Sequence, residues 1–256
     1  MRPHCLLIFA FCLCISVSAI AAPPEEGLVL WFGFNEDTEG IVEDLSGMGN
    51  DGTITGDVEW TGNGKYGGGM QFTEGMIGVP NSETVTFEEE ITIAFWINSD
   101  DVVDSYRRLV GYGWAGNGSY ILGIDNHWMN MAFAWDIMNV GGTRFDANMD
   151  ALVTPGEWQF VTGTYDGSML KLYVNGEMKI QNAADGKING IADISISQEG
   201  LGIEGGSFIG IMDEIRLYNV ALSDEEIQQA MEEPKSAAVL PAEKLSTAWG
   251  AVKCSY

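Results

Sequence analysis

Short runs of apolar residues alternate with Gly, Asn and Asp from about residue 25 to residue 233. The run 91–98 alternates with period two and places Ile91, Ile93, Phe95 and Ile97 on one face. Because successive side chains of a strand point to opposite faces, this pattern predicts a strand with one buried side. No Pro- or Ser-rich linker interrupts the region, so we expect one domain over residues 25–233.

Three further runs predict an antiparallel meander. They cover residues 158–165, 169–174 and 177–180. The last two runs are joined by Asn175-Gly176, the strongest short signal for a two-residue hairpin turn. One helix is predicted over residues 224–232, because Ser223 and Glu226 have the spacing of a capping box.

The two ends of the chain differ from this domain. Residues 1–21 have the features of a secretory signal peptide: a basic start, an apolar run and small residues before an expected cleavage after Ala21. The run is shorter than the ~20 apolar residues of a membrane-spanning helix. We therefore expect a soluble protein that the Sec route exports to the periplasm or the extracellular space, with no membrane span after cleavage. Residues 234–256 are predicted to form a flexible tail, or alternatively an attachment segment that uses Trp249 or Cys254.

Charge limits the partners of the protein. The chain has 12 Lys and Arg against 37 Asp and Glu, and its formal net charge is −25. A protein that neutralises nucleic-acid phosphates needs clustered basic residues, whereas the one adjacent basic pair here is Arg107-Arg108. The balance argues against nucleic acid, other polyanions and anionic membrane surfaces as main partners. The 33 glycines are almost twice the average share of about 7%, which favours a turn-rich all-β fold.

Few residues remain for redox or zinc chemistry once the signal peptide is removed. Cys254 and His127 are then the last cysteine and the last histidine. This excludes disulfides within the domain and Cys/His zinc clusters. An unpaired exported cysteine could instead bridge two chains, so a disulfide-linked dimer through Cys254 is one expectation.

Several segments together suggest a family. WQFVTGTYDG at 158–167 and LKLYVNG at 170–176 are followed by GIMDEIRLYNVALS at 210–223, and LWFGFN at 30–35 and GGGMQF at 67–72 precede them. In this order the segments resemble the laminin-G-like jelly rolls of the concanavalin A-like lectin/glucanase superfamily. The resemblance implies an all-β, two-sheet antiparallel jelly-roll sandwich with one short C-terminal helix.

A structural calcium ion is the cofactor that we expect. Alternation along 211–217 places Asp213 on the apolar face with Ile211, Ile215 and Leu217, and a carboxylate directed at a core needs a compensating partner. Calcium prefers six to eight oxygen ligands.

The expected calcium ligands come from two parts of the chain. The resemblance implies an ion between the oxygen-rich loop 43–52 and the terminal strand, so Asp44, Asn50 and Asp213 are the predicted ligands, together with backbone carbonyls. The alternative is that Asp213 accepts hydrogen bonds from loop N–H groups without a metal.

Ligand binding is expected in the aromatic-rich centre of the chain. Trp114 and Trp128 lie in loop-like segments, and Asp125 precedes the second of them. Tryptophan faces stack on sugar rings, and a few polar groups fix the orientation of the sugar. The alternative is that these aromatic residues close the ends of the sandwich as core, as we expect for Trp31, Trp96 and Trp158.

No catalytic constellation is evident. Retaining glycoside hydrolases need two carboxyl groups only ~5 Å apart, and we find no Glu-x-Asp-x-Glu pattern on a strand. His127 lacks a Gly-x-Ser-x-Gly nucleophile motif. The sequence therefore predicts a secreted, non-catalytic module that recognises an extracellular glycan. An adhesion module that binds a cell-surface or matrix protein is the alternative, followed by a glycoside hydrolase or polysaccharide lyase.

Overall fold

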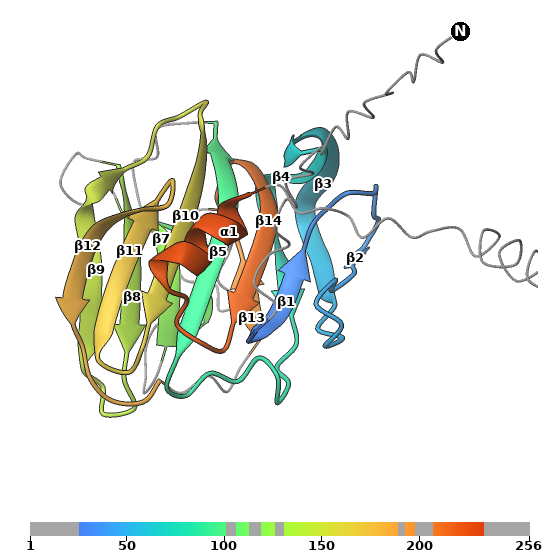
Figure 1. Ribbon diagram of the computed structural model, residues 1–256. Helices are drawn as coiled ribbons and strands as arrows, with labels where there is room; N and C mark the ends of the chain where they lie inside the picture. Colours follow the sequence, from blue (N-terminus) through green and yellow to red (C-terminus); the bar gives the residue numbers. More distant parts are fainter. Residues whose placement is uncertain are drawn as a thin grey trace, which may run out of the picture. The chain divides into compact units, whose positions relative to one another are not determined.

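The structure is a computed structural model that describes residues 26–100, 106–112, 119–125, 131–188, 193–197 and 207–232. Within these ranges the chain forms fourteen strands and one helix (Figure 1). The elements are, in chain order, β1 (Leu28–Phe32), β2 (Ile41–Val42), β3 (Gly52–Tyr66), β4 (Gly68–Val79), β5 (Ile91–Ser99), β6 (Arg107–Tyr112), β7 (Ser119–Asp125), β8 (Ala132–Met138), β9 (Arg144–Leu152), β10 (Trp158–Tyr165), β11 (Met169–Val174), β12 (Glu177–Ala183), β13 (Ile194–Ile196), β14 (Gly210–Tyr218) and α1 (Asp224–Met231). The predicted antiparallel β fold with one short C-terminal helix is confirmed.

Two layers of strands share β4. One layer runs β12-β11-β10-β5-β14, and the other runs β13-β6-β7-β8-β9. The first half of β4 pairs with β14 through Met70 and Phe72, whereas Ile77 and Val79 at its other end pair with β13. In Figure 1, β7, β8 and β9 lie behind β10, β11 and β12. Hydrogen bonding is therefore continuous through β4, although the strands pack as two faces of a sandwich.

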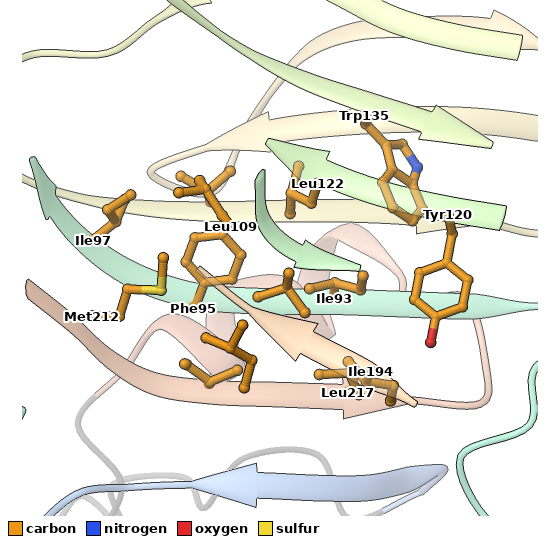
Figure 2. Close-up of a cluster of buried hydrophobic side chains, with 14 of the residues drawn as sticks. Ile93, Phe95, Ile97, Leu109, Tyr120, Leu122, Trp135, Ile194, Met212 and Leu217 are labelled. Atoms are coloured by element: carbon orange, nitrogen blue, oxygen red, sulfur yellow. The ribbon is translucent and has the colours of Figure 1, made fainter. Parts of the chain in front are cut away.

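The main core fills the space between the layers, as Figure 2 shows. The first layer contributes Ile93 and Phe95 of β5, whereas the second contributes Leu122 of β7 and Trp135 of β8, all with 0% exposure. Ile91 and Ile97 belong to the same cluster, so the predicted buried face of residues 91–98 is confirmed. Burial of this many large apolar side chains is the main stabilising contribution to such a fold.

The predicted meander is confirmed as β10, β11 and β12, with β12 continuing to Ala183. The turn between β11 and β12 places Asn175 and Gly176 at φ values of 54° and 74°, as a type I′ turn requires. Asn175 also accepts the backbone N–H of Phe160 through Oδ1 at 2.9 Å. This side chain therefore ties the hairpin turn to the start of β10.

The helix α1 covers the opposite side of the first layer, over β10, β5 and β14 (Figure 1). A second apolar cluster lies there, in which Ile227 and Ala230 of the helix pack with Trp96, Phe160 and Tyr218. The predicted capping box at Ser223 and Glu226 is present. Trp96 is buried in this cluster and Trp158 packs against it, in agreement with their expected structural role.

The last turn of α1 has no basic residue of its own. Its carbonyl groups receive donors from the sheet instead. Arg216 donates to the carbonyl of Ala230, and the Tyr66 hydroxyl donates to the carbonyl of Met231 at 3.0 Å. The guanidinium of Arg216 also pairs with Glu214, and both side chains are fully buried. These contacts satisfy C-terminal carbonyl groups that a helix leaves without intrahelical partners.

A β-bulge in β14 overturns the predicted direction of Asp213. The pairing of β14 with β5 shifts between Asp213 and Arg216, and Glu214 there has a φ of 55°. One inserted residue reverses the alternation. Asp213 therefore pairs with Trp96, a member of the cluster beneath α1, whereas Ile215 continues in the main core. The prediction that Asp213 shares the face of Ile215 was wrong.

Among the described residues, no helix combines the length and the apolar character needed to cross a bilayer. The predicted signal peptide at residues 1–21 and the tail at 234–256 lie outside the described residues, as do His127 and Cys254. Export, the tail and the disulfide-linked dimer therefore stay predictions.

Candidate ligand-binding face

One side of the second layer carries a polar cluster and is called the outer face of β6–β9. In β8, Phe133, Trp135 and Ile137 enter the core, so the residues between them point to this outer face. Cross-strand pairing fixes which residues of the neighbouring strands share it. Its members include Arg108, Gly111, Ser119, Ile121, Gly123, Asp125, Ala132, Ala134, Asp136, Met138, Arg144 and Asp146. Of these twelve residues, only Arg144 and Asp146 are exposed.

Asp136 is the centre of the polar cluster. Its Oδ1 accepts two bonds from Arg144, from Nε at 3.2 Å and from Nη2 at 2.9 Å. Its Oδ2 accepts the hydroxyl of Tyr106 at 3.3 Å. The carboxylate of Asp136, which lies on β8, therefore links Tyr106, just before β6, to Arg144 on β9.

Glycine gives Tyr106 its place on this face. A Cβ atom at Gly123 would lie 3.1 Å from the Tyr106 hydroxyl oxygen and 2.6 Å from the Arg107 carbonyl oxygen. The absence of a side chain at Gly123 therefore lets Tyr106 lie over β7 and reach Asp136. Arg108 approaches the same tyrosine, with its guanidinium carbon 5.8 Å from the ring centroid. Such a cation–π contact is favourable, particularly where water is partly excluded.

Burial and charge shift the titration of this cluster. Burial raises the pKa of the Asp136 carboxyl, and the opposite charge of Arg144 offsets part of the rise. Burial likewise raises the pKa of the Tyr106 hydroxyl, which keeps it a hydrogen-bond donor. Burial lowers the pKa of Arg144, but attraction to Asp136 outweighs this and the net pKa is raised.

Access to the cluster is uneven. The side chain of Asp136 is 7% exposed, whereas that of Arg144 is 44% exposed. Asp146, the register partner of Asp136 on β9, is also exposed. A molecule that approaches from solvent therefore meets Arg144 and Asp146 first. This arrangement offers a charged, hydrogen-bonding surface held from beneath by a buried carboxylate.

The sequence predicted a different set of ligand-binding residues. Trp114 and Trp128 lie outside the described residues, and Asp125 is the half-buried last residue of β7. The segment with Trp114 follows the end of β6 at Tyr112 and leads into the start of β7, whereas the segment with Trp128 follows the end of β7. The connections therefore meet opposite ends of a seven-residue strand, roughly 20 Å apart. Asp125 pairs with Ala132 and therefore lies on the outer face of β6–β9, at the end of β7 that precedes the second connection.

The predicted calcium ligands Asp44 and Asn50 do lie together. Oδ2 of Asp44 accepts the backbone N–H of Asn50 at 2.9 Å and the Ser46 hydroxyl at 2.8 Å, and Oδ1 accepts the N–H groups of Trp31 and Ser46. Oδ1 of Asn50 accepts the hydroxyl of Ser82 at 2.7 Å. Protein donors therefore occupy these oxygens, and they tie the loop to β1.

Asp213 is bonded elsewhere. Its carboxylate accepts the backbone N–H groups of Tyr66 and Glu214, at 2.9 and 2.8 Å. Burial raises its pKa to about 7. Within the described ranges no three His, Cys, Asp or Glu side chains form a group that could hold a metal, and no hydrogen bond joins Asp213 to Asp44 or Asn50. The hydrogen-bond partners of Asp213 thus differ from those of Asp44 and Asn50, and calcium binding by the three residues stays a prediction.

An open cavity of about 490 Å³ lies on another part of the surface, lined by residues 86–90 with Asn219 and Val220. Lys187 forms ion pairs with Glu88 and Glu89 at its rim, at 3.1 and 3.0 Å. The lining is polar and acidic, and none of its charged side chains is buried, so the cavity has no counterpart to the buried Asp136 that fixes the exposed Arg144. The outer face of β6–β9 is therefore the better candidate for ligand recognition.

Sequence reasoning missed Tyr106, Asp136 and Arg144 as site residues. Two signals were present: Arg107-Arg108 is the one adjacent basic pair, and Asp136 interrupts the apolar segment 132–137. Neither signal shows which charges meet, because the meeting depends on cross-strand register.

The family of the protein follows from this fold together with the sequence. Residues 72–228, more than half of the chain, match the Laminin G 3 family, described as the Concanavalin A-like lectin/glucanases superfamily. The chain belongs to this superfamily.

Individual relatives share parts of the chain. Human pappalysin-1 (Homo sapiens) is 33% identical over 108 residues, which is 40% of this chain and 6% of the relative. The chain thus spans a small fraction of that protein.

Two solved structures have a similar fold. Domain 4 of AbnA, an extracellular arabinanase of family GH43 from Geobacillus stearothermophilus, in complex with arabinotriose, has 16% identity and a TM-score of 0.66, and the match covers 82% of this chain and 100% of that chain. The ligand-binding domain of botulinum neurotoxin serotype D, in complex with N-acetylneuraminic acid, has 18% identity and a TM-score of 0.59, and the match covers 80% of this chain and 50% of that chain. At these identities the likeness describes the fold.

Proposed function

We propose that the protein is an extracellular, non-catalytic carbohydrate-binding module and that the outer face of β6–β9 receives the sugar. The observation that carries the proposal is the cluster in which buried Asp136 holds the exposed Arg144 at 2.9 Å. A side chain fixed in this way loses little conformational entropy on binding, because one hydrogen-bonding arrangement is already selected. Sugar hydroxyls need such convergent, pre-positioned polar groups for orientation.

Related folds support a sugar ligand. The arabinanase domain was solved with arabinotriose and the neurotoxin domain with N-acetylneuraminic acid. Both structures therefore hold a saccharide on a domain whose fold is similar to that of this chain. Because one fold hosts many activities, the residues of the outer face, and not the fold, give the proposal its content.

The same residues argue for binding without catalysis. Asp136 and Asp146 are register partners on this face, and a retaining hydrolase would need one such carboxyl group to donate a proton. Although burial raises the pKa of Asp136, both of its oxygens are already engaged, Oδ1 by Arg144 and Oδ2 by Tyr106, and its side chain is only 7% exposed, so it is poorly placed to give a proton to a glycosidic oxygen. Incubation with polysaccharides should release no reducing ends.

A glycan array tests the function. Wild-type protein should bind at least one class of glycan, and Arg144→Ala and Asp136→Ala should each reduce that signal by tenfold or more. Lys179→Ala is the matched control, because Lys179 also pairs with an acidic residue, Glu177 at 2.7 Å, but lies on β12. Binding that survives both outer-face variants and disappears in Trp114→Ala or Trp128→Ala would move the site to the loops.

A protein partner is the second candidate function, and one observation favours it. The segment 41–48 exposes three large apolar side chains, Ile41, Leu45 and Met48, with exposures of 59, 43 and 51%. Exposed apolar groups that gather in one segment are typical of protein-binding surfaces. A chain that binds no glycan, and whose protein binding disappears when Leu45 and Met48 are replaced by Ser, would support an adhesion module.

Calcium remains a proposal with its own test. Asp44 and Asn50 could offer oxygens to calcium only by giving up the hydrogen bonds described above. If a bound ion stabilises the folded protein, a chelator that removes the ion should lower the stability of the fold. A melting temperature that falls in EDTA and recovers with added Ca²⁺, but not with Mg²⁺, would support calcium, and an unchanged value would remove it.

A further inference from the structure

Arg144 has an unused hydrogen-bonding edge. Its Nε and Nη2 atoms both donate to the same oxygen, Oδ1 of Asp136, and its hydrogen bonds to the described residues end there. A guanidinium carries five N–H donors in a rigid plane. The donors that remain lie on a side chain with 44% exposure. They are available to a planar acceptor from solvent.

We propose that Arg144 receives the carboxylate of a sugar acid, so that the ligand is a glycan ending in one carboxylated sugar. The inference rests on the proposed carbohydrate-binding function and names its ligand class. A carboxylate matches the guanidinium fork with two parallel N–H···O bonds, whereas a sugar hydroxyl matches it less well. Asp136 acts as a positioning residue, because it fixes the plane of the guanidinium from beneath.

The surroundings of Arg144 restrict the ligand to a single negative charge near this site. Asp146 is exposed on the same strand and the same face, two positions away. The chain as a whole carries a formal charge of −25. A polyuronate would place further carboxylates against this negative field, whereas one carboxylate beside Arg144 lies well within the screening length of about 8 Å at physiological salt. A terminal sugar acid therefore brings one carboxylate that Arg144 can pair with, whereas a polyuronate brings further carboxylates that find no second exposed cation among the described residues of the face and are repelled by Asp146.

The experiment compares matched ligands on wild-type protein. The panel consists of oligosaccharides ending in N-acetylneuraminic, glucuronic, galacturonic or iduronic acid, each with its methyl ester and its neutral parent. Calorimetry should show at least one acid that binds about tenfold or more tightly than its ester, because esterification removes the charge but keeps the shape. A polyuronate should bind more weakly than the terminal acid.

Variants then assign the effect to Arg144. Arg144→Gln should abolish the preference of the protein for the acid over the ester, and Arg144→Lys should keep only part of it because Lys lacks the planar fork. Lys179→Gln makes the same change of charge on β12 and should leave the preference intact. Melting temperatures check that each variant is folded.

The outcomes separate this inference from the proposed function. Glycans that bind with no preference for any acid over its ester would overturn the inference and leave carbohydrate binding in place. An acid preference that survives Arg144→Gln would overturn the assignment to Arg144. Failure to bind any glycan, acidic or neutral, would overturn both proposals.

Discussion

The backbone N–H of Tyr66 donates to Oδ2 of Asp213 at 2.9 Å, although 147 positions separate the two residues in the chain. This bond joins the end of β3 to the bulge in β14. It also holds a fully buried carboxyl group whose pKa burial raises to about 7. The stability of the fold should therefore depend on the protonation of Asp213.

The first prediction concerns pH. Below about pH 3.8 both folded and unfolded Asp213 are protonated. Between that value and about 7 the folded state keeps the proton and the unfolded state loses it, so the contribution of this group to the free energy of unfolding falls as pH rises. Asp213→Asn should therefore gain stability relative to wild type between pH 5 and pH 7. Urea unfolding at several pH values measures the difference.

Asp166→Asn is the control for this pH effect. Hydrogen bonds from Ser168 and Met169 lower the pKa of Asp166, although burial opposes them, so its contribution is lost only at lower pH. Its difference from wild type should stay constant between pH 5 and pH 7. A similarly constant difference for Asp213→Asn would contradict the role given to Asp213.

The second prediction concerns the buried ion pair beneath α1. Arg216→Met would leave Glu214 buried without its cation and Ala230 without a donor to its carbonyl, at a cost of about 3–5 kcal/mol. Adding Glu214→Gln should recover part of this loss, because a neutral amide is cheaper to bury than a charge. Denaturant unfolding of the four proteins gives the coupling energy. Strict additivity of the two substitutions would show that the ion pair is not coupled.

The third prediction concerns packing in the main core. A Cβ atom at Gly163 of β10 would lie 2.8 Å from the indole of Trp135. Gly163→Ala should therefore destabilise the fold by about 1–3 kcal/mol through overpacking. Gly62→Ala is the control, because the nearest neighbour of its Cβ atom lies 3.7 Å away. Equal melting temperatures for the two variants would rule out a close contact at Trp135.

The fourth prediction concerns the start of α1. The Ser223 hydroxyl accepts the backbone N–H of Glu226, and the Glu226 carboxylate accepts the N–H of Ser223 at 2.8 Å. Ser223→Ala should cost about 1 kcal/mol, whereas Ser223→Thr keeps the hydroxyl and should cost less. Thermal unfolding measures both. Equal losses in the two variants would mean that the hydroxyl contributes little.

Local sequence signals anticipated much of the fold. The alternation at Ile91, Ile93, Phe95 and Ile97, the Asn175-Gly176 turn and the Ser223 capping box each reflect interactions between residues close in the chain. Such features follow from periodicity and turn chemistry alone. The architecture then follows because the strands have one apolar face to bury.

The position of Asp213 could not be predicted in the same way. Strict alternation places Asp213 on the same face as Ile215. The bulge at Glu214 inserts one residue between them, so the two side chains point to opposite faces of β14. Glycine commonly marks a left-handed position, whereas Glu214 adopts a φ of 55° without any such signal. The surrounding contacts of Trp31 and Arg216 with its side chain hold it there, and they come from distant segments.

The polar cluster on the outer face escaped prediction for a related reason. Tyr106, Asp136 and Arg144 are spread over 39 positions, and no motif joins them. Their meeting depends on the register of β6, β7, β8 and β9 and on the missing side chain at Gly123. The sequence favours Trp114 and Trp128 instead, because tryptophan faces stack on sugar rings.

The pairing of β1 with β14 has a practical consequence. Leu28 lies opposite Tyr218, so the first strand and the last strand of the sandwich are direct neighbours. The chain leaves the domain only after α1, and Leu28 of β1 and Met231 of α1 pack against the same apolar cluster. A domain whose first and last elements lie close together can be inserted into a surface loop of a host protein without separating the two ends of that loop. The sandwich is therefore suited to serve as an inserted cassette, with α1 following shortly after the exit strand and the outer face of β6–β9 carried on the other layer.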